Sequence, residues 1–593
     1  MKKSIKATLS LAFAAMLALS AACSGNDDGG TNGNRPKGDK IVIYAGGSSE
    51  FKWVKGSAED EIIDYIEQKY YDETGNSLDF EVAFLDDQMT QKLSMEISGG
   101  GQVDVAISHT RGGAGIDDGA QSNGGFGYVD ISRRIKAVAP NLVKQTDVYN
   151  YEKIDGTPLD ALTSLEGKLV GIPSVINPYK FGILARKDYM DALGYTEDVT
   201  KEGETCAATG ENWKIVDNLE TFEEMCLAIN GKTGRSYAVS GAPWDLEKVL
   251  TLGAFGVSGY FTETLYTLED GTEVVVPGEG TAAYQEVLAL EMKWAQIGVI
   301  SKESQIIKVS QGESDFISGN TGVFVLDPTV QHLITVAKKT KARSPEAEFT
   351  LLPPLRAYKD KNACPTDKNG EPRKGFMRNT EATFAAVLPE TTRNADKVLK
   401  FLNWVYKSAD NYNLCRYGIE GTHWEKVGEN KYKYVGTDSK GNAYSVTNPP
   451  YSGILTFVEN QNISNLVYDG YTEQELSWIE YAKTEDFYIE NNMIDYMLPG
   501  GGGDANYFNN IRNQLKDNVI FHAWKGGNEQ TGLTTREKLL TEWNSYVNKY
   551  YEKVLDKNNE LRDSEQLGYL KRRAENYKTM REARIQKRAE AEE

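Results

Sequence analysis

The stretch from Gly167 to Gly194, GKLVGIPSVINPYKFGILARKDYMDALG, constrains the fold more than any other part of the sequence. A short extended segment is interrupted by Pro173, Asn177 and Pro178, and an apolar run follows. Proline fixes φ and favours an extended conformation for the residue before it. The pattern therefore predicts a stiff connector between two bodies, with Pro173 to Phe181 as a bending strap.

The length of the chain agrees with more than one body. At 593 residues it exceeds what a single hydrophobic core usually supports, so at least two domains are expected. The net charge of −20 argues against nucleic acid or an anionic membrane surface as a partner, because both would repel the chain. Aromatic residues make up 10% of the chain, which fits either core packing or a surface that stacks on sugar rings or peptides.

The amino terminus predicts export. Three lysines precede an apolar run from Leu9 to Leu19, and small residues then lead to Cys23. This arrangement is typical of a signal peptide, here residues 1–22, and the run is too short for a permanent membrane helix. The Gly-, Asn- and Asp-rich residues 23–39 predict a flexible tether. No later stretch is long and apolar enough to cross a bilayer.

The residues after the tether predict a parallel sheet. Strands and helices alternate by their hydrophobic periodicity, over residues 40–45, 59–71, 78–85, 88–97 and 103–108. This order is typical of a parallel sheet with helices on its faces, and ligands bind beyond the carboxyl ends of such strands. Trp53, Asp86 and Asp87 follow the first two strands, so we expect them at a ligand site.

Three motifs resemble those of one protein family. The run G-K-x-x-G-[IL]-P … N-P … R-K-D-x-x-D-x-L-G within 167–194 is similar to the first lobe-to-lobe crossover of bacterial extracellular solute-binding proteins that serve ABC importers. The resemblance is greatest to the large oligosaccharide-binding lipoproteins (family 1 type). LPETTRNADKVLKFLNWVYKSAD, from Leu388, is similar to a helix of these proteins, and YGIEGTHW, from Tyr417, is similar to their Y-G-[IL]-E-G-x-x-[YW] element.

The resemblance implies a fold and a domain organisation. The expected fold is α/β and two-lobed, of the type II periplasmic-binding-protein kind. Each lobe is a mixed sheet flanked by helices, and a multi-strand hinge joins the lobes. We expect the first lobe to comprise 40–175 and 378–425, and the second 183–376 and 426–560, with extra C-terminal helices. Residues 561–593 are expected to form a helical tail that is polar on every side.

The resemblance also implies further site residues. They lie after predicted strands or in the predicted crossovers, and they are His109, Arg111, Tyr179, Trp244, Asp245, Asp327, Arg378, His423 and Trp424. Trp244 could stack on a sugar ring while Asp245 accepts hydroxyl hydrogens, but Trp244 fits a core position equally well. Asp327 stands before Pro328 and could equally cap a helix.

The function implied by the resemblance is capture of a solute. The expected protein is lipidated at Cys23, which resembles a lipobox cysteine, and is held at the cell membrane on its extracellular or periplasmic side. Its expected partners are a carbohydrate, most simply an oligosaccharide, and the permease subunits of an ABC importer. We expect a monomer without cofactor, metal or nucleic acid. Two alternatives stay open, a secreted glycan-active enzyme and a ligand receptor for a two-component sensor kinase.

Other motifs limit the chemistry. No G-x-S-x-G or H-E-x-x-H pattern occurs, so no motif supports a catalytic function. The four cysteines after Cys23 match no zinc pattern and could form zero, one or two disulfides. The TDKNG and TDSKG segments lack the further carboxylates of a calcium loop, and we predict hairpin turns at both.

Overall fold

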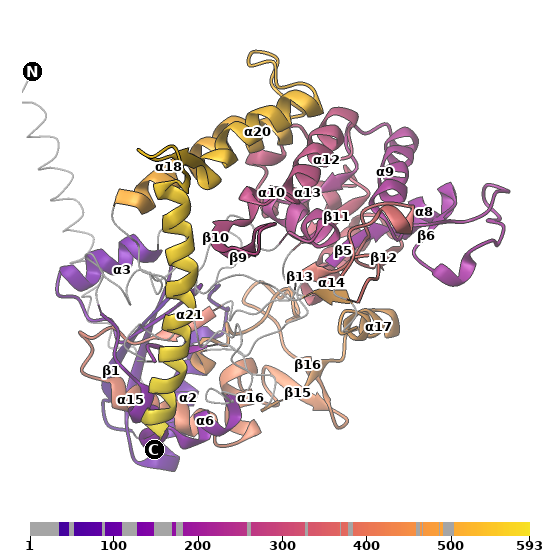
Figure 1. The fold of residues 1–593 in the computed structure, drawn as a ribbon. Coiled ribbons are helices and arrows are strands. Elements are labelled where there is room, and N and C mark those ends of the chain that lie inside the picture. Colours follow the sequence, from indigo (N-terminus) through magenta and orange to yellow (C-terminus); the bar gives the residue numbers. More distant parts are fainter. Residues whose placement is uncertain are drawn as a thin grey trace, which may run out of the picture.

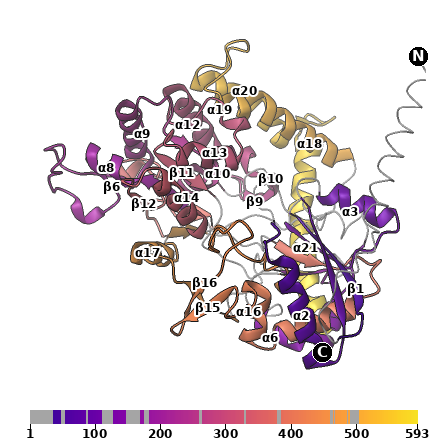
Figure 2. The same ribbon diagram turned by 180° about the vertical axis from the view of Figure 1, so that it is seen from behind.

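The computed structural model describes most of the chain after the amino-terminal segment. The described residues are 35–46, 53–85, 89–109, 127–146, 169–173, 182–257, 263–326, 330–367, 369–377, 384–457, 463–464, 466–484, 487–489 and 503–592. They form two α/β bodies, which Figure 1 shows at lower left and upper right and Figure 2 shows from behind. The two-lobed α/β fold expected from the sequence is therefore present.

The first body is built on a five-stranded sheet of order β2-β1-β3-β14-β4. Its strands are β1 (Asp39–Ala45), β2 (Leu78–Phe84), β3 (Val105–His109), β4 (Gly171–Pro173) and β14 (Phe384–Val387). Its helices are α2 (Glu59–Thr74), α3 (Met89–Ser98), α5 (Ser132–Val138), α6 (Pro140–Thr146), α15 (Ala395–Val405) and α16 (Ala409–Tyr417). β1 runs parallel to β2 and β3, as the β-α-β order predicts.

Amphipathic stripes hold this body together. Ile62, Ile66 and Tyr70 lie on one face of α2 and are each at most 2% exposed. The Tyr70 ring meets the edges of Phe401 and Trp404 of α15, with ring centroids 5.4 Å and 5.5 Å apart. Burial of such side chains contributes about 1.5–3 kcal/mol each, so this packing fixes both helices on the sheet.

The second body is built on a four-stranded sheet of order β12-β5-β11-β8. Its strands are β5 (Gly182–Arg186), β8 (Val239–Ser240), β11 (Val323–Leu326) and β12 (Phe349–Leu352). Its helices are α8 (Lys187–Leu193), α9 (Leu219–Thr233), α10 (Pro243–Leu246), the π-helix η4 (Glu247–Thr251), α11 (Leu252–Phe255), α12 (Tyr284–Ile297), α13 (Val309–Ile317) and α14 (Val330–Arg343). Asn218 caps α9, because its side chain accepts the Thr221 N–H at 2.9 Å.

The chain crosses between the bodies where the proline-marked stretch predicts it. β4 belongs to the first sheet and β5, the next strand, belongs to the second. The chain returns between β13 (Phe376–Met377), which lies in the second body, and β14 of the first sheet. Residues 174–181 and 378–383, the connectors themselves, lie outside the described residues.

A third passage between the bodies runs through a small tyrosine-rich sheet. This sheet consists of β15 (Trp424–Val427), β16 (Lys431–Tyr434) and β17 (Val467–Tyr468), and α17 (Glu473–Tyr481) follows it. Between β16 and β17, the side chains of Tyr451, Ile454 and Phe457 pack in the core of the first body. The structure therefore differs here from the expected assignment of 426–560 to the second lobe.

The carboxyl-terminal part adds helices to the second body, and the last of them extends from there toward the first body (Figure 1). They are α18 (Gly503–Leu515), the π-helix η10 (Lys516–Ile520), α19 (Phe521–Trp524), α20 (Arg536–Tyr551) and α21 (Glu565–Glu592). A hairpin of β19 (Lys553–Leu555) and β20 (Leu561–Asp563) precedes α21. None of the described helices combines the length and apolar composition that a membrane span needs.

The last helix is not solvated on every side as the sequence predicts. Leu567, Leu570 and Ala574 are buried at 2–3% exposure. α21 packs along β10 (Glu273–Pro277), and Arg573 and Lys578 pair with Glu263 and Glu273 of the β9–β10 hairpin. β9 spans Glu263–Thr267. A few apolar positions three and four residues apart are enough to dock one face of an otherwise polar helix.

Candidate ligand-binding site

The first sheet brings the ends of several strands to one edge. Because β1, β2 and β3 are parallel and β14 is antiparallel to β3 and β4, the carboxyl ends of β1 to β4 and the amino end of β14 meet there. The residues predicted for the site in the first lobe and in the crossovers adjoin these strand ends, namely Trp53, Asp86, Asp87, His109, Arg111, Tyr179 and Arg378. A shared location of these residues stays a prediction.

Most of these side chains lie outside the described residues. This holds for Asp86, Asp87, Arg111, Tyr179 and Arg378, and for the side chain of His109, which ends β3. Trp53 is described, is half-buried and packs against the core of the first body. Their contacts with a ligand therefore stay predictions.

In the second sheet, as in the first, the ends of several strands meet at one edge. β8, β11 and β12 are parallel to one another and antiparallel to β5, so their carboxyl ends meet the amino end of β5. Trp244 and Asp245 follow β8, and Asp327, outside the described residues, follows β11. The residues predicted from the second lobe thus share the edge at which the first crossover enters.

The first crossover limits how far apart these edges can lie, and the return connector limits the distance from β13, which is not a strand of the second sheet, to β14. From Pro173 to Gly182 the chain takes nine residue steps, so the two ends of the crossover lie within about 32 Å at about 3.6 Å per step. The return from Met377 to Phe384 takes seven steps, which limits its span to about 25 Å.

Trp244 and Asp245 lie on a tightly packed turn. Gly241 has a φ of +156°, and a Cβ there would lie 2.8 Å from the Val325 carbonyl oxygen, so a side chain at this position would collide with β11. Pro243 starts α10 directly afterwards. Trp244 remains half-buried against the core of the second body, whereas Asp245 is only 2% exposed. The partly exposed Trp244 ring fits the stacking role better than a fully buried core position.

His423 and Trp424 lie inside the protein. Trp424 is 3% exposed and its indole N–H donates to the Gly418 carbonyl oxygen at 2.8 Å. The Ile419 N–H donates to His423 Nδ1 at 3.3 Å, and burial lowers the pKa of His423. In this structure both residues hold the turn after α16 together, and a ligand contact by either stays a prediction.

Sequence reasoning missed a group of tyrosines between the bodies. The ring centroids of Tyr417 and Tyr432 lie 4.4 Å apart, and the ring centroid of Tyr468 lies 5.6 Å from that of Tyr432. On the far side Lys338 of α14 lies 5.0 Å from the ring centroid of Tyr471. Alternation in the KYKY segment, which puts Tyr432 and Tyr434 on one face of a strand, is the sequence signal that could have indicated this group.

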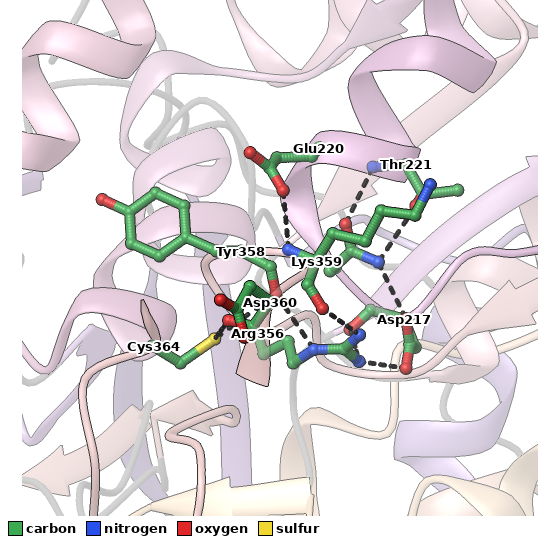
Figure 3. Close-up of polar contacts among 9 residues, drawn as sticks. Asp217, Glu220, Thr221, Arg356, Tyr358, Lys359, Asp360 and Cys364 are labelled. Carbon is green, nitrogen blue, oxygen red and sulfur yellow. Dashed lines mark hydrogen bonds and ion pairs between the residues drawn. The ribbon is translucent and has the colours of Figure 1, made fainter. Parts of the chain in front are cut away.

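A second group missed by the sequence lies at the root of the return crossover (Figure 3). The Arg356 guanidinium pairs with Asp217 and donates to the carbonyl oxygens of Tyr358 at 3.0 Å and Lys359 at 3.2 Å. The Lys359 N–H in turn donates to Glu220 of α9 at 2.6 Å. The backbone of Arg356 also forms an antiparallel β-bridge with that of Lys374, which lies just before β13. We call the contacts of Arg356 with Asp217 and the two carbonyl oxygens the Arg356 clamp, and it lies next to the strand from which the chain leaves the second body.

The two candidate calcium segments are hairpin turns, as predicted. Asp367 accepts the N–H groups of Asn369 and Glu371 at 2.8 Å and 3.0 Å, and Asp438 accepts those of Lys440 and Asn442 at 2.9 Å and 2.8 Å. These carboxylates are thus engaged by their own loops. Within the described ranges no group of three or more His, Cys, Asp or Glu residues could hold a metal ion.

The described cysteines are free thiols. Cys206, Cys226, Cys364 and Cys415 are all buried and none pairs with another. The sequence left zero, one or two disulfides open, and the structure has none among these four.

Comparison with known proteins identifies the fold. No family model and no curated protein matches the sequence. Among solved structures, the N-glycan transport solute-binding protein NgtS from Streptococcus pneumoniae aligns with a TM-score of 0.58 at 15% identity, over 91% of this chain and 99% of that one. The chain has the fold of an extracellular solute-binding protein.

Two further solute-binding proteins align over nearly their whole length. The S. pneumoniae ABC-transporter substrate-binding protein FusA, in complex with kestose, gives a TM-score of 0.52 at 15% identity over 92% of this chain and 100% of that one. An "HMO binding", ABC-transporter-associated solute-binding protein from Bifidobacterium longum infantis gives a TM-score of 0.53 at 14% identity, over 91% of this chain and 99% of that one. The solute-binding-protein fold therefore spans both bodies and the helical additions.

Proposed function

We propose that this protein is a lipid-anchored solute-binding protein that captures a carbohydrate, expected to be an oligosaccharide, and delivers it to an ABC permease. The observation that carries the proposal is the pair of sheet edges that the first crossover joins directly. Trp244 and Asp245 follow a strand that ends at one of these edges, and we expect the other predicted contact residues of the two sheets and the crossovers to lie there too. The sugar-transport descriptions of the aligned proteins support a carbohydrate as the solute.

The proposed mechanism is mechanical. The two bodies exchange between open and closed arrangements, and a solute that contacts both edges favours the closed one by its higher affinity for it. The half-buried Trp244 offers an apolar ring face to a sugar, and carboxylates such as Asp86 and Asp87 accept hydroxyl hydrogens. No bond is made or broken in this cycle.

The proposed function includes a lipid anchor at the amino terminus. Lipidation of Cys23 would hold the receptor at the membrane, and residues 23–39 would act as the tether. A tether raises the effective concentration of the receptor beside its permease. The closed shape of the receptor is then what the permease recognises.

A glycan panel tests the proposal. Full-length mature protein is screened by thermal shift against defined oligosaccharides, and hits are titrated by calorimetry while released reducing ends are measured. We expect stabilisation and saturable binding with an unchanged glycan. Released reducing ends would instead support a glycan-active enzyme, and binding without transport in a permease-containing membrane would favour a sensor-kinase receptor.

A further inference from the structure

Two carboxyl groups share one indole N–H deep in the second body. Trp524 of α19 donates to Glu291 Oε2 at 2.7 Å and to Glu247 Oε1 at 3.2 Å. Glu247 is fully buried and Glu291 is 3% exposed. The Tyr284 hydroxyl donates to Glu247 at 2.7 Å, and the Thr251 hydroxyl donates to Glu291 at 3.4 Å. We call Glu247 and Glu291 the carboxyl pair.

The groups around the carboxyl pair leave it without a compensating cation. None of the ion pairs among the described residues includes Glu247 or Glu291. Glu279 also raises the pKa of Glu247, and it pairs with Arg512 of α18 at 3.0 Å. The groups that donate hydrogen bonds to the pair are the hydroxyls of Tyr284 and Thr251 and the indole of Trp524, and all three are neutral.

Ionising two adjacent buried carboxyl groups without a nearby cation has a high free-energy cost. Burial raises the pKa of Glu291 to about 7. Burial, with the adjacent Glu291 charge adding to it, raises the pKa of Glu247 well above its ordinary value. At neutral pH the carboxyl pair therefore retains at least one proton, which lets one carboxyl donate to the other.

The carboxyl pair joins the candidate site to the C-terminal helices. Glu247 opens the π-helix that directly follows Trp244 and Asp245, and Trp524 lies in α19. The same π-helix packs against β13, the root of the return crossover. A small cavity lined by Pro243, Leu246, Glu291, Trp294, Ile300, Ser304 and Trp524 lies alongside. The hydrogen bonds of Trp524 to Glu247 and Glu291 therefore connect α19 to the segment that follows α10.

We propose that Glu247 and Glu291 form a proton-dependent latch that holds the Trp244–Asp245 segment against α19. In the closed arrangement the buried carboxyl groups stay protonated, and the segment is held. In the open arrangement they reach solvent and can ionise, so a higher pH favours opening and the segment detaches more often. This assigns a regulation to the proposed binding site and rests on the proposed function only for the role of Trp244 and Asp245.

Hydrogen exchange on the full chain tests the latch without any ligand. Peptides covering 243–255 and 515–526 are followed at pH 5.5 and 7.5, with rates corrected for intrinsic exchange. Opening exposes Glu291 with an ordinary pKa, so the opening equilibrium rises by up to about tenfold per pH unit between the two pKa values. We expect protection of both peptides to fall by about tenfold or more at pH 7.5.

Matched variants separate the latch from ordinary packing. The Glu247→Gln/Glu291→Gln variant keeps neutral hydrogen-bonding groups of the same size, so its protection should be independent of pH. Glu286→Gln changes a partly exposed glutamate of α12 that pairs with Arg536 and should keep the wild-type pH dependence. Equal wild-type protection at both pH values would overturn the latch, whether or not the double variant folds. Failure of every glycan to bind, with this pH dependence intact, would overturn the proposed function instead.

Discussion

Leu326, the last residue of β11, pairs in antiparallel register with Gly182, the first residue of β5. The chain therefore enters the second body beside the strand that leads to Asp327. This pairing places the end of the first crossover at the same edge as the residues predicted to bind a solute. A connector attached at the binding edge can transmit a contact with solute directly into movement of the lobes.

The half-buried ring of Trp244 should contribute to solute affinity. Replacing it by alanine removes a stacking face, and we expect the Kd for a hit oligosaccharide to rise about 5- to 20-fold, corresponding to about 1–2 kcal/mol. Trp244→Phe should retain part of the affinity. Calorimetric titration measures both. Trp213→Ala, a half-buried tryptophan next to Lys201 on another surface segment, is the control and should bind as the wild type does; an unchanged Kd for Trp244→Ala would remove Trp244 from the site.

The Arg356 clamp should stabilise the second body. Arg356→Gln leaves Asp217 and two carbonyl oxygens without their donor, and a hydrogen bond to a charged group is worth about 1.5–3 kcal/mol. We expect the free energy of unfolding in urea to fall by about 2 kcal/mol. Arg562→Gln removes an arginine whose side chain is 59% exposed and should change it little. If Arg356→Gln and Arg562→Gln lowered the free energy of unfolding equally, the contacts of Arg356 would not stabilise the second body more than an exposed arginine does.

Glu313 should make stability fall in acid. The hydrogen bond from His332, with a further one from Lys339, lowers the pKa of Glu313 to about 2. A depressed pKa means that the stabilisation is present above the ordinary pKa of about 4.3 and is lost as pH falls toward 2. We expect Glu313→Gln to lower the free energy of unfolding at pH 7 by about 1 kcal/mol, a small value because both donors are partly exposed.

The effect of Glu313→Gln on the free energy of unfolding should depend on pH. Because glutamine does not titrate, the difference between wild type and Glu313→Gln should shrink between pH 4.5 and pH 2. Urea titrations at pH 7, 4.5 and 2.5 measure it. A constant difference across this range would mean that the ionised carboxylate contributes nothing beyond its packing.

Cys23 should determine whether the protein stays on the membrane. In a bacterial host that lipidates exported proteins, the wild type should partition into the detergent phase of a Triton X-114 extraction. Cys23→Ala should move to the aqueous phase or the medium with its glycan affinity unchanged, since the tether carries no predicted contact. Wild-type protein in the aqueous phase would argue against lipidation while leaving capture of the solute in place.

Local sequence patterns predicted much of the fold but only the backbone frame of the site. The helix expected over 59–71 is present, and its apolar stripe of Ile62, Ile66 and Tyr70 is buried, because periodicity acts within one helix. By contrast, nothing near Trp424 in the sequence indicates that its indole is turned inward to Gly418.

The sequence by itself determined the two bodies, the place of the first crossover and the α/β order of the first sheet. These depend on proline geometry and on hydrophobic periods that act over a few residues. Only the tertiary structure decided that Glu247, Glu291 and Trp524 meet, that Arg356 clamps Asp217, and that α21 docks on β10. Such contacts join segments far apart along the chain, and sequence separation carries no information about which distant side chains will share a buried space.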